Sequence, residues 1–249
     1  MAKVVAVHSF RGGTGKSSIT ASLAALVAAA GHRVGVVDTD IQSPGIHVLF
    51  GLGEEQIGHT LNDHLWGRCA IQDAAYEVDG AGGGALYLIP SSLKIGEIAR
   101  VLREGYDVDV LNDSFRQVVD ALALEYLFID THPGLNEETL VSISISDVLV
   151  IIMRPDEQDY LGTAVTLDVA RRLFVPRLGL VVNKVLAPFD EAQVRAEVGA
   201  AYGCEVLGVL PHADDMMRLS SRGVFAVRHP DHGLTATLRG VAAAIAVDA

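Results

Sequence analysis

The 249-residue chain is predicted to fold as a single α/β domain, residues 1–249, with one open, mostly parallel, twisted sheet that carries helices on both faces. One reason is composition: half of the residues are hydrophobic and a fifth are charged, which supplies a sizeable core and excludes general disorder. The other reason is that short apolar runs alternate with helical segments along the chain, as in βαβ units with right-handed crossovers.

Seven short apolar runs are continuous in Val, Ile and Leu, which is typical of strands buried on both faces. We expect strands over 4–7, 34–37, 86–89, 126–129, 148–152, 178–182 and 206–210. Between them we expect helices over 17–30, 110–123, 137–145, 160–174 and 192–202. Gly31 is the expected stop of the first helix. The glycine-rich stretch 79–85 is expected to be a flexible surface loop, since strand–helix alternation resumes after it.

The segment 11–18 reads Arg-Gly-Gly-Thr-Gly-Lys-Ser-Ser and lies between the first expected strand and the first expected helix. A phosphate-binding loop requires this context, because glycines let backbone N–H groups surround phosphate oxygens and a helix N-terminus adds a positive dipole end. Lys16 would reach the β and γ phosphates, and the Ser17 hydroxyl would bind Mg²⁺. The regular spacing GxxxxGK[ST] is not met, since Phe10 occupies the first glycine position. A glycine-rich turn without a special role is the alternative.

Acidic side chains follow two of the expected strands. Asp38 and Asp40 come after strand 34–37, and Asp130 comes after strand 126–129. The carboxyl ends of parallel strands meet at one edge of a sheet, so these carboxylates are expected near the bound phosphates. A carboxylate at the end of an apolar strand is costly unless it meets a cation or a hydrogen-bond donor. The alternative for Asp38 or Asp40 is a loop or a helix cap.

Four motifs in this order resemble those of the MinD/ParA ATPases, a group of P-loop NTPases. Residues 11–17 resemble the deviant Walker A sequence KGGxGK[ST], and residues 38–45, DTDIQSPG, resemble switch I, DxDxQxP. Residues 130–134, DTHPG, resemble Walker B with switch II, DTPxG, and Asn183-Lys184 resembles the NK pair of the base-binding strand. The set is most similar to MinD-like members.

The resemblance implies that the chain binds ATP or ADP together with Mg²⁺. The residues that it implies for nucleotide binding are Gly12, Gly13, Thr14, Gly15, Lys16, Ser17, Ser18, Gly134, Asn183 and Pro211. Ser17, Asp40 and Asp130 would hold Mg²⁺, largely through water. The Asn183 amide suits adenine, and GTP stays open even though Leu186 breaks the NKxD pattern of GTPases.

Lys16, Asp40 and Arg11 are the catalytic residues that the resemblance implies. Asp40 would orient the attacking water or the Mg²⁺ shell. Arg11 stands where the family has a signature lysine that reaches the partner subunit's phosphates, and arginine offers a fixed charge for the same task. The alternative is that Arg11 pairs with a local carboxylate. His132 also departs from the family's switch II, and a solvated loop histidine is the simpler interpretation.

The function implied is an ATP-hydrolysing switch that forms a homodimer with ATP bound, acts slowly without a protein activator, and positions or regulates a partner or cargo. One alternative is a regulator that binds nucleotide with little turnover. Another is a metal-delivery ATPase, which needs closely spaced soft ligands. Cys69 and Cys204 are isolated in the sequence and do not supply such a pair.

Charge and terminal sequences limit the surfaces that the chain is expected to use. The formal net charge of −12 disfavours nonspecific DNA binding, although Arg171, Arg172 and Arg177 form a small basic group. Residues 238–249 carry one basic residue and no aromatic one, so direct membrane anchoring is not expected. The isolated cysteines and the absence of a signal-peptide pattern favour a cytoplasmic location.

Overall fold

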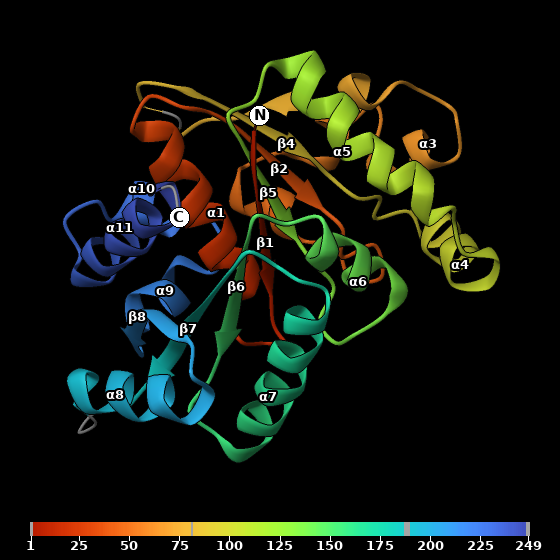
Figure 1. Ribbon diagram of the computed structural model, residues 1–249. Coiled ribbons are helices and arrows are strands. Elements are labelled where there is room, and N and C mark those ends of the chain that lie inside the picture. The colour runs from red at the N-terminus through yellow and green to blue at the C-terminus, as the bar shows by residue number, and fades with distance from the viewer. Residues whose placement is uncertain (1, 81, 187–189, 248–249) are drawn as a thin grey trace.

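The computed structural model, described over residues 2–80, 82–186 and 190–247, is built on one eight-stranded sheet with the strand order β3-β4-β2-β5-β1-β6-β7-β8 (Figure 1). All neighbouring strands are parallel except β3, which pairs antiparallel with β4. The strands are β1 (Lys3–His8), β2 (Arg33–Asp38), β3 (Tyr76–Glu77), β4 (Ala85–Ile89), β5 (Tyr126–Asp130), β6 (Val148–Met153), β7 (Arg177–Val185) and β8 (Glu205–Pro211). The predicted open, mostly parallel sheet is confirmed.

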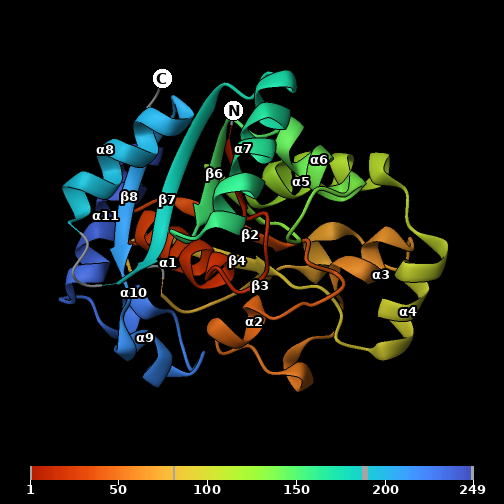
Figure 2. The same ribbon diagram turned by 90° about the horizontal axis from the view of Figure 1, so that it is seen from below.

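Helices cover both faces of the sheet, as predicted. They are α1 (Lys16–Ala29), α2 (Ile46–Leu49), α3 (Leu61–Leu65), α4 (Ile95–Glu104), α5 (Val108–Leu122), α6 (Glu137–Ser144), α7 (Glu157–Arg172), α8 (Glu191–Tyr202), α9 (Asp214–Leu219), α10 (Phe225–Arg228) and α11 (Gly233–Ala246). One face packs against α1, α10 and α11, and the other against α5, α6, α7 and α8 (Figures 1 and 2).

The alternation of side chains along β1 explains these two layers. Val5 and Val7 belong to the core beneath α1 and α11, whereas Ala6 belongs to the core beneath α7 and α8. All three side chains are fully buried, because β1 lies in the middle of the sheet between β5 and β6. The loop that follows β1 therefore leaves from the centre of the carboxyl edge, the edge that Figure 2 faces.

The glycine-rich stretch 79–85, expected as a flexible loop, packs against the end of α1 in its described part. A Cβ added at Gly84 would lie 2.5 Å from the Ala28 carbonyl oxygen and 2.8 Å from the His32 nitrogen. Gly82 has a φ of +57°, and its added Cβ would lie 3.1 Å from the Ala29 Cα. Close backbone packing therefore accounts for glycine at these two positions.

Among the described residues, no helix combines the length and the apolar character that crossing a bilayer requires.

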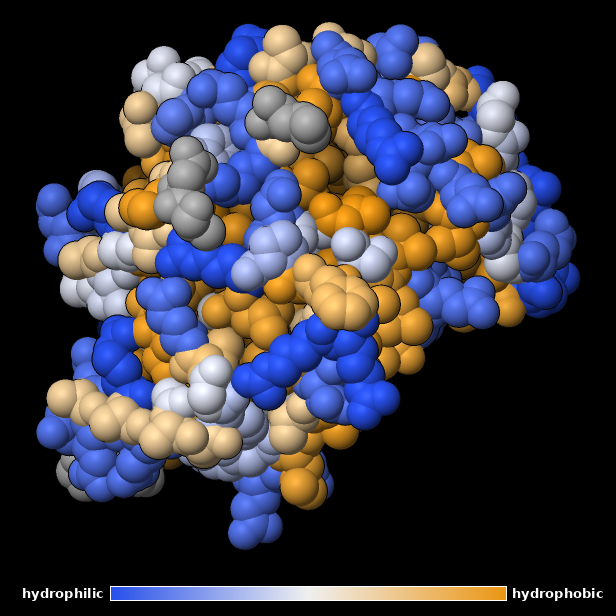
Figure 3. Space-filling model, in the orientation of Figure 1, coloured by the Kyte–Doolittle hydropathy of each residue, from blue (hydrophilic) through white to orange (hydrophobic). Residues whose placement is uncertain are grey.

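Apolar side chains gather near the centre of the face seen in Figure 3. A hollow of about 790 Å³ opens at the amino edge of the sheet, and its lining includes Val4, Phe115, Ile145 and Pro176. This hollow is at the opposite end of β1 from the phosphate loop.

Candidate functional site

The phosphate loop, residues 11–18, joins β1 to α1 and takes its shape from two glycines. Gly13 has a φ of +77° and Gly15 a φ of +94°, both in the left-handed region that side chains rarely adopt. A Cβ at Gly15 would also lie 2.6 Å from the Asn183 amide nitrogen. The loop conformation therefore depends on glycine, as the motif predicts.

The end of β7 braces this loop. The Asn183 amide nitrogen donates to the Thr14 carbonyl oxygen over 2.7 Å, and Lys184 Nζ donates to the Gly13 carbonyl oxygen over 2.7 Å. Asn183 is buried. Asn183, which is predicted to contact the base, thus holds the loop backbone, a contact that the motif alone does not reveal. Pro211, the last residue of β8, pairs in register with Val185 and is exposed.

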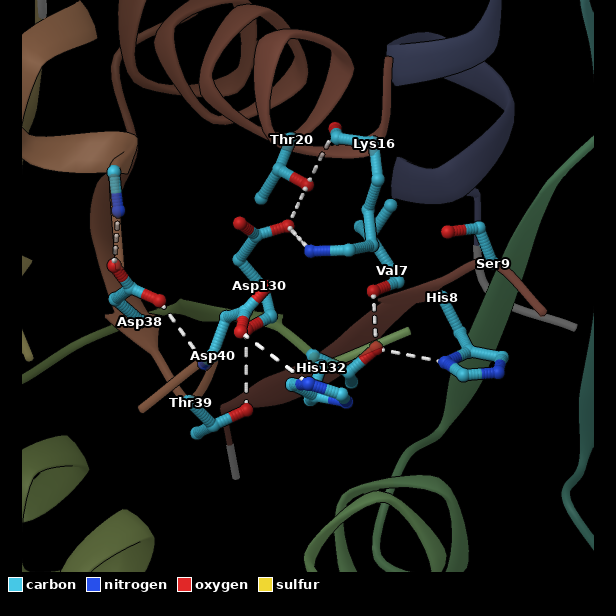
Figure 4. A network of polar contacts seen from close by, with 12 residues as sticks. Val7, His8, Ser9, Lys16, Thr20, Asp38, Thr39, Asp40, Asp130 and His132 are labelled. Carbon is cyan, nitrogen blue, oxygen red and sulfur yellow. Dashed lines mark hydrogen bonds and ion pairs between the residues drawn. The ribbon is translucent and has the colours of Figure 1, made fainter. Parts of the chain in front are cut away.

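Lys16 and Asp130 form a buried ion pair at the start of α1 (Figure 4). Lys16 Nζ lies 2.8 Å from Asp130 Oδ1, and the Thr20 hydroxyl donates to the same oxygen over 2.9 Å. The two charged side chains are 7% and 1% exposed. Asp130 therefore meets both a cation and a donor, which satisfies the requirement stated for a carboxylate at this position. Ser17 and Ser18 lie beside Lys16 in the first turn of the helix.

Asp38 and Asp130 lie side by side on neighbouring strands, since they are register partners between β2 and β5. Burial and the nearby Asp130 carboxylate raise the pKa of Asp38 to about 8. Asp38 also orders switch I, residues 38–45, because its two oxygens accept from the backbone N–H groups of Asp40 and Gly45 over 3.0 and 3.3 Å. The loop-organising alternative for Asp38 matches these contacts.

Asp40 lies near Asp38 and Asp130. Burial raises the pKa of the Asp40 carboxyl, and Lys16 opposes that shift. Its Oδ1 accepts from the Ser43 N–H over 3.1 Å. Three carboxylates facing one lysine favour a further cation, and carboxylate oxygens suit Mg²⁺. No group of three or more His, Cys, Asp or Glu side chains among the described residues converges closely enough to hold a metal alone. Water and phosphate oxygens would complete the shell of a Mg²⁺ ion held by Ser17, Asp40 and Asp130.

Arg11 pairs with carboxylates of its own chain. Its guanidinium lies 3.3 Å from Asp156 Oδ1 and 3.5 Å from Asp159 Oδ1, at the start of α7. Arg154 contacts the same two carboxylates at 3.0 and 3.3 Å. In this conformation the alternative interpretation of Arg11 describes its contacts. A reach toward a second subunit requires Arg11 to leave them.

Phe10 and Gly134 connect the phosphate loop to the elements beside it. The Phe10 side chain packs over Gly162 of α7, where an added Cβ would lie 2.7 Å from the Phe10 Cβ. The N–H of Gly134, one of the residues predicted to bind nucleotide, donates to the Ser9 carbonyl oxygen over 3.2 Å. Gly134 also has a φ of +85°, which suits glycine.

His8 is a buried residue of the site that sequence reasoning missed. Its Nδ1 lies 2.8 Å from the Thr131 hydroxyl oxygen, and its side chain is fully buried. Burial, with smaller effects from Lys16 and His132, lowers the pKa of His8 to about 3. A histidine at the end of an otherwise apolar strand was the available signal.

Comparison with known proteins agrees with this geometry. The family model described as "ParA: NUBPL iron-transfer P-loop NTPase" matches residues 1–246. An uncharacterized ATP-binding protein of Methanocaldococcus jannaschii is 29% identical over 244 residues, which cover 98% of this chain and 87% of the relative.

Two solved structures share the fold. The septum site-determining protein MinD of Pyrococcus horikoshii, complexed with Mg-ADP, superposes with a TM-score of 0.82 at 18% identity, covering 99% of this chain and 96% of that one. MinD of Aquifex aeolicus in a MinC:MinD complex gives 0.81 at 17% identity, covering 100% and 97%. With a braced phosphate loop at the head of α1 and a family match over almost its whole length, the chain belongs to the ParA family of P-loop NTPases, the MinD/ParA group.

Proposed function

We propose that this protein is an Mg²⁺-dependent ATPase switch that forms a homodimer with ATP bound and is read by a partner protein. The observation that carries the proposal is the buried Lys16–Asp130 pair at the head of α1, beneath a phosphate loop braced by Asn183 and Lys184. This arrangement places a cation, backbone N–H groups and carboxylates at one edge of the sheet. Such an edge binds phosphate and a divalent cation.

In this mechanism the chain supplies positions and charges. The N–H groups of residues 12–18 surround the β-phosphate, and Lys16 turns from Asp130 toward the β and γ oxygens. Ser17, Asp40 and Asp130 would hold Mg²⁺, which would supply positive charge to neutralise the charge that develops on the phosphate oxygens. Asp40 orients a water molecule, whose oxygen forms a bond to the γ-phosphorus as the bond from that phosphorus to the β–γ bridging oxygen breaks. The bonding pair leaves on the bridging oxygen of ADP, and the proton of the water passes to the released phosphate or to solvent.

Arg11 completes the site of a second subunit in this proposal. Its planar guanidinium offers two parallel hydrogen bonds to phosphate oxygens. The exchange requires its contacts with Asp156 and Asp159 to break. Turnover by the isolated protein is therefore slow, and a partner that favours the released position of Arg11 accelerates it.

The setting that we propose is the cytoplasm, without direct membrane anchoring and without strong nonspecific DNA binding. The description of the matching family names iron transfer. Cys69 and Cys204 pack against different core clusters, and the described residues contain no cluster of metal ligands. The two thiols therefore do not supply a closely spaced pair within one chain, which is the observation on which we prefer the switch to metal delivery.

Size-exclusion chromatography with light scattering tests the proposal, with no nucleotide, with ADP and with ATP, each with Mg²⁺. We expect a dimer only with ATP, and a longer-lived dimer for Asp40→Ala, which slows hydrolysis. Arg11→Ala is expected to hydrolyse ATP more slowly than the wild type while binding it. A monomer in every condition contradicts the homodimer, and a dimer in every condition favours a regulator that signals by nucleotide occupancy.

A further inference from the structure

Two histidines lie where switch II, residues 130–134, leaves the sheet (Figure 4). His8 lies at the end of β1, and His132 lies two residues beyond the end of β5. His8 contacts Thr131, and the His132 side chain faces Asp40 of switch I. The pair therefore connects β1, switch II and switch I.

The tautomer of His8 follows from its partner. The Thr131 hydroxyl donates its one hydrogen to the Val7 carbonyl oxygen over 3.1 Å. Its oxygen must then accept from His8, so the His8 Nδ1 carries the ring hydrogen and donates over 2.8 Å. The Thr131 N–H also donates to the Val7 carbonyl oxygen, over 3.3 Å. Thr131 is therefore fixed to β1 by three contacts, and this fixes the starting direction of switch II.

His132 points from this fixed position toward switch I. Its Nε2 lies 3.8 Å from Asp40 Oδ1, and the two side chains are 23% and 13% exposed. His132 Nδ1 is buried and makes no hydrogen bond within the described part of the chain. A neutral ring has one N–H, and Nε2 is the nitrogen that faces an acceptor. The distance exceeds that of a hydrogen bond, and contacts of this kind at active sites tighten when substrate binds.

Among the described residues, few other groups restrain the Asp40 carboxylate. The Ser43 N–H donates to its Oδ1 from within switch I. Lys16, Asp130 and Asp38 are the charged groups nearby, and Lys16 is paired with Asp130. The contact with His132 thus links Asp40 of switch I to switch II.

We infer that His132 is a positioning residue for ATP hydrolysis: its Nε2–H holds the Asp40 carboxylate at the phosphate edge, from a loop that His8 and Thr131 fix to β1. The inference rests on the proposed function, because Asp40 is the group proposed to orient the attacking water. Since a misplacement of about 1 Å at a reacting group costs up to about a hundredfold in rate, loss of the contact is expected to act on kcat.

Two substitutions of similar size separate positioning from packing. The amide nitrogen of His132→Gln reaches the place of Nε2, whereas that of His132→Asn reaches only the place of Nδ1. We expect His132→Asn to lower kcat by about tenfold or more with KM for ATP changed less than about twofold, and His132→Gln to recover most of the rate. In an Asp40→Ala background, His132→Asn is expected to have no further effect. Equal rates for both variants and the wild type, or an additive loss in that background, overturn the inference.

Imidazole ¹⁵N NMR at about pH 8 supplies a readout that does not depend on turnover. We expect the Nδ1–H tautomer for His8 and the Nε2–H tautomer for His132, with Asp40→Ala shifting the His132 signals and leaving those of His8 in place. An Nδ1–H tautomer for His132, or no response to Asp40→Ala, overturns the inference. Failure of the proposed function is distinct, because the wild type would then neither bind nor hydrolyse ATP while these NMR signals stay as expected.

Discussion

At the scale of single residues, breaking the Lys16–Asp130 pair is predicted to lower the free energy of unfolding strongly. Removing one partner of a buried ion pair leaves an uncompensated charge, which costs about 3–5 kcal/mol. Lys16→Met is therefore expected to lower the free energy of unfolding in urea by about that amount, measured without nucleotide. Asp130→Asn added to Lys16→Met removes the orphaned charge and should restore most of the loss. An unchanged midpoint for Lys16→Met contradicts the buried pair seen in the structure.

His8 is predicted to make the protein sensitive to mild acid. Its pKa is about 3 in the folded protein, against a reference value of 6.5. Above about pH 6.5 the His8 imidazole is neutral in both the folded and the unfolded protein. As the pH falls below that value, His8 of the unfolded chain binds a proton and His8 of the folded protein does not, so the free energy of unfolding decreases. By linkage the loss reaches about 1.4 kcal/mol at about pH 5.5.

The matched control is His8→Asn, whose amide nitrogen replaces Nδ1 as a donor to Thr131 but does not titrate. Urea unfolding between about pH 7.5 and 5.5 should show a shallower loss for this variant than for the wild type. Equal slopes would mean that His8 is not held neutral in the fold.

At this scale the motifs predict the residues of the phosphate loop and of Walker B, but they do not predict the contacts of His8 or Arg11. Lys16 and Asp130 come together in the structure because the start of α1 and the end of β5 lie at the same edge of the sheet, where each buried charge needs a partner. His8 belongs to none of these motifs, and one histidine at the end of an apolar strand does not reveal a partner 123 residues away. The contacts of Arg11 with Asp156 and Asp159 do not follow from the sequence, because sequence spacing does not distinguish carboxylates of the same chain from phosphates bound to another.

At the scale of elements, the Phe10 side chain packs on α7, and we expect it to decide whether Gly162→Ala lowers or raises the free energy of unfolding. A Cβ at position 162 would overlap the Phe10 side chain. Gly162→Ala is therefore expected to lower the free energy of unfolding by about 1–3 kcal/mol, despite the better helix propensity of alanine. In a Phe10→Ala background the same change should be neutral or stabilise by up to about 1 kcal/mol.

A thermodynamic cycle over the four proteins measures this coupling. The control is Gly96→Ala in α4, where an added Cβ has nothing within 4 Å. If Gly162→Ala lowers the free energy of unfolding by the same amount in the Phe10→Ala background, contact with the Phe10 ring is not the cause of the loss.

Long elements followed from the sequence better than short ones did. The predicted strands are continuous apolar runs and the predicted helices have a helical period, and the observed limits of both differ from the predicted ones by a few residues. α4 and α11, with 10 and 14 residues, had no predicted range. β3, with two residues, and α2 and α10, with four each, are too short to show a period. β3 is placed by its pairing with β4, and α2 and α10 are placed by their packing against α1, which pattern reasoning does not reach.

At the scale of the whole molecule, nucleotide binding is predicted to stabilise the fold. A ligand at about one hundred times its dissociation constant adds about 2.7 kcal/mol, which for a chain of this size corresponds to a rise in Tm of about 5–11 °C. Mg-ADP should produce this shift, EDTA should reduce it, and Lys16→Met should abolish it. An equal shift for the wild type and Lys16→Met would place the nucleotide somewhere other than the phosphate loop.

Lys3 joins the first strand to the last helix, since its Nζ donates to the carbonyl oxygens of Ile245 and Ala246 over 3.2 Å. Both positions lie at the amino edge of the sheet, about 20 Å from the phosphate loop for a strand as long as β1. A fluorophore placed beside either one would leave the nucleotide loops untouched. Energy transfer between two copies labelled there would measure how the subunits of the proposed dimer are oriented, from the edge of the sheet opposite the phosphate loop.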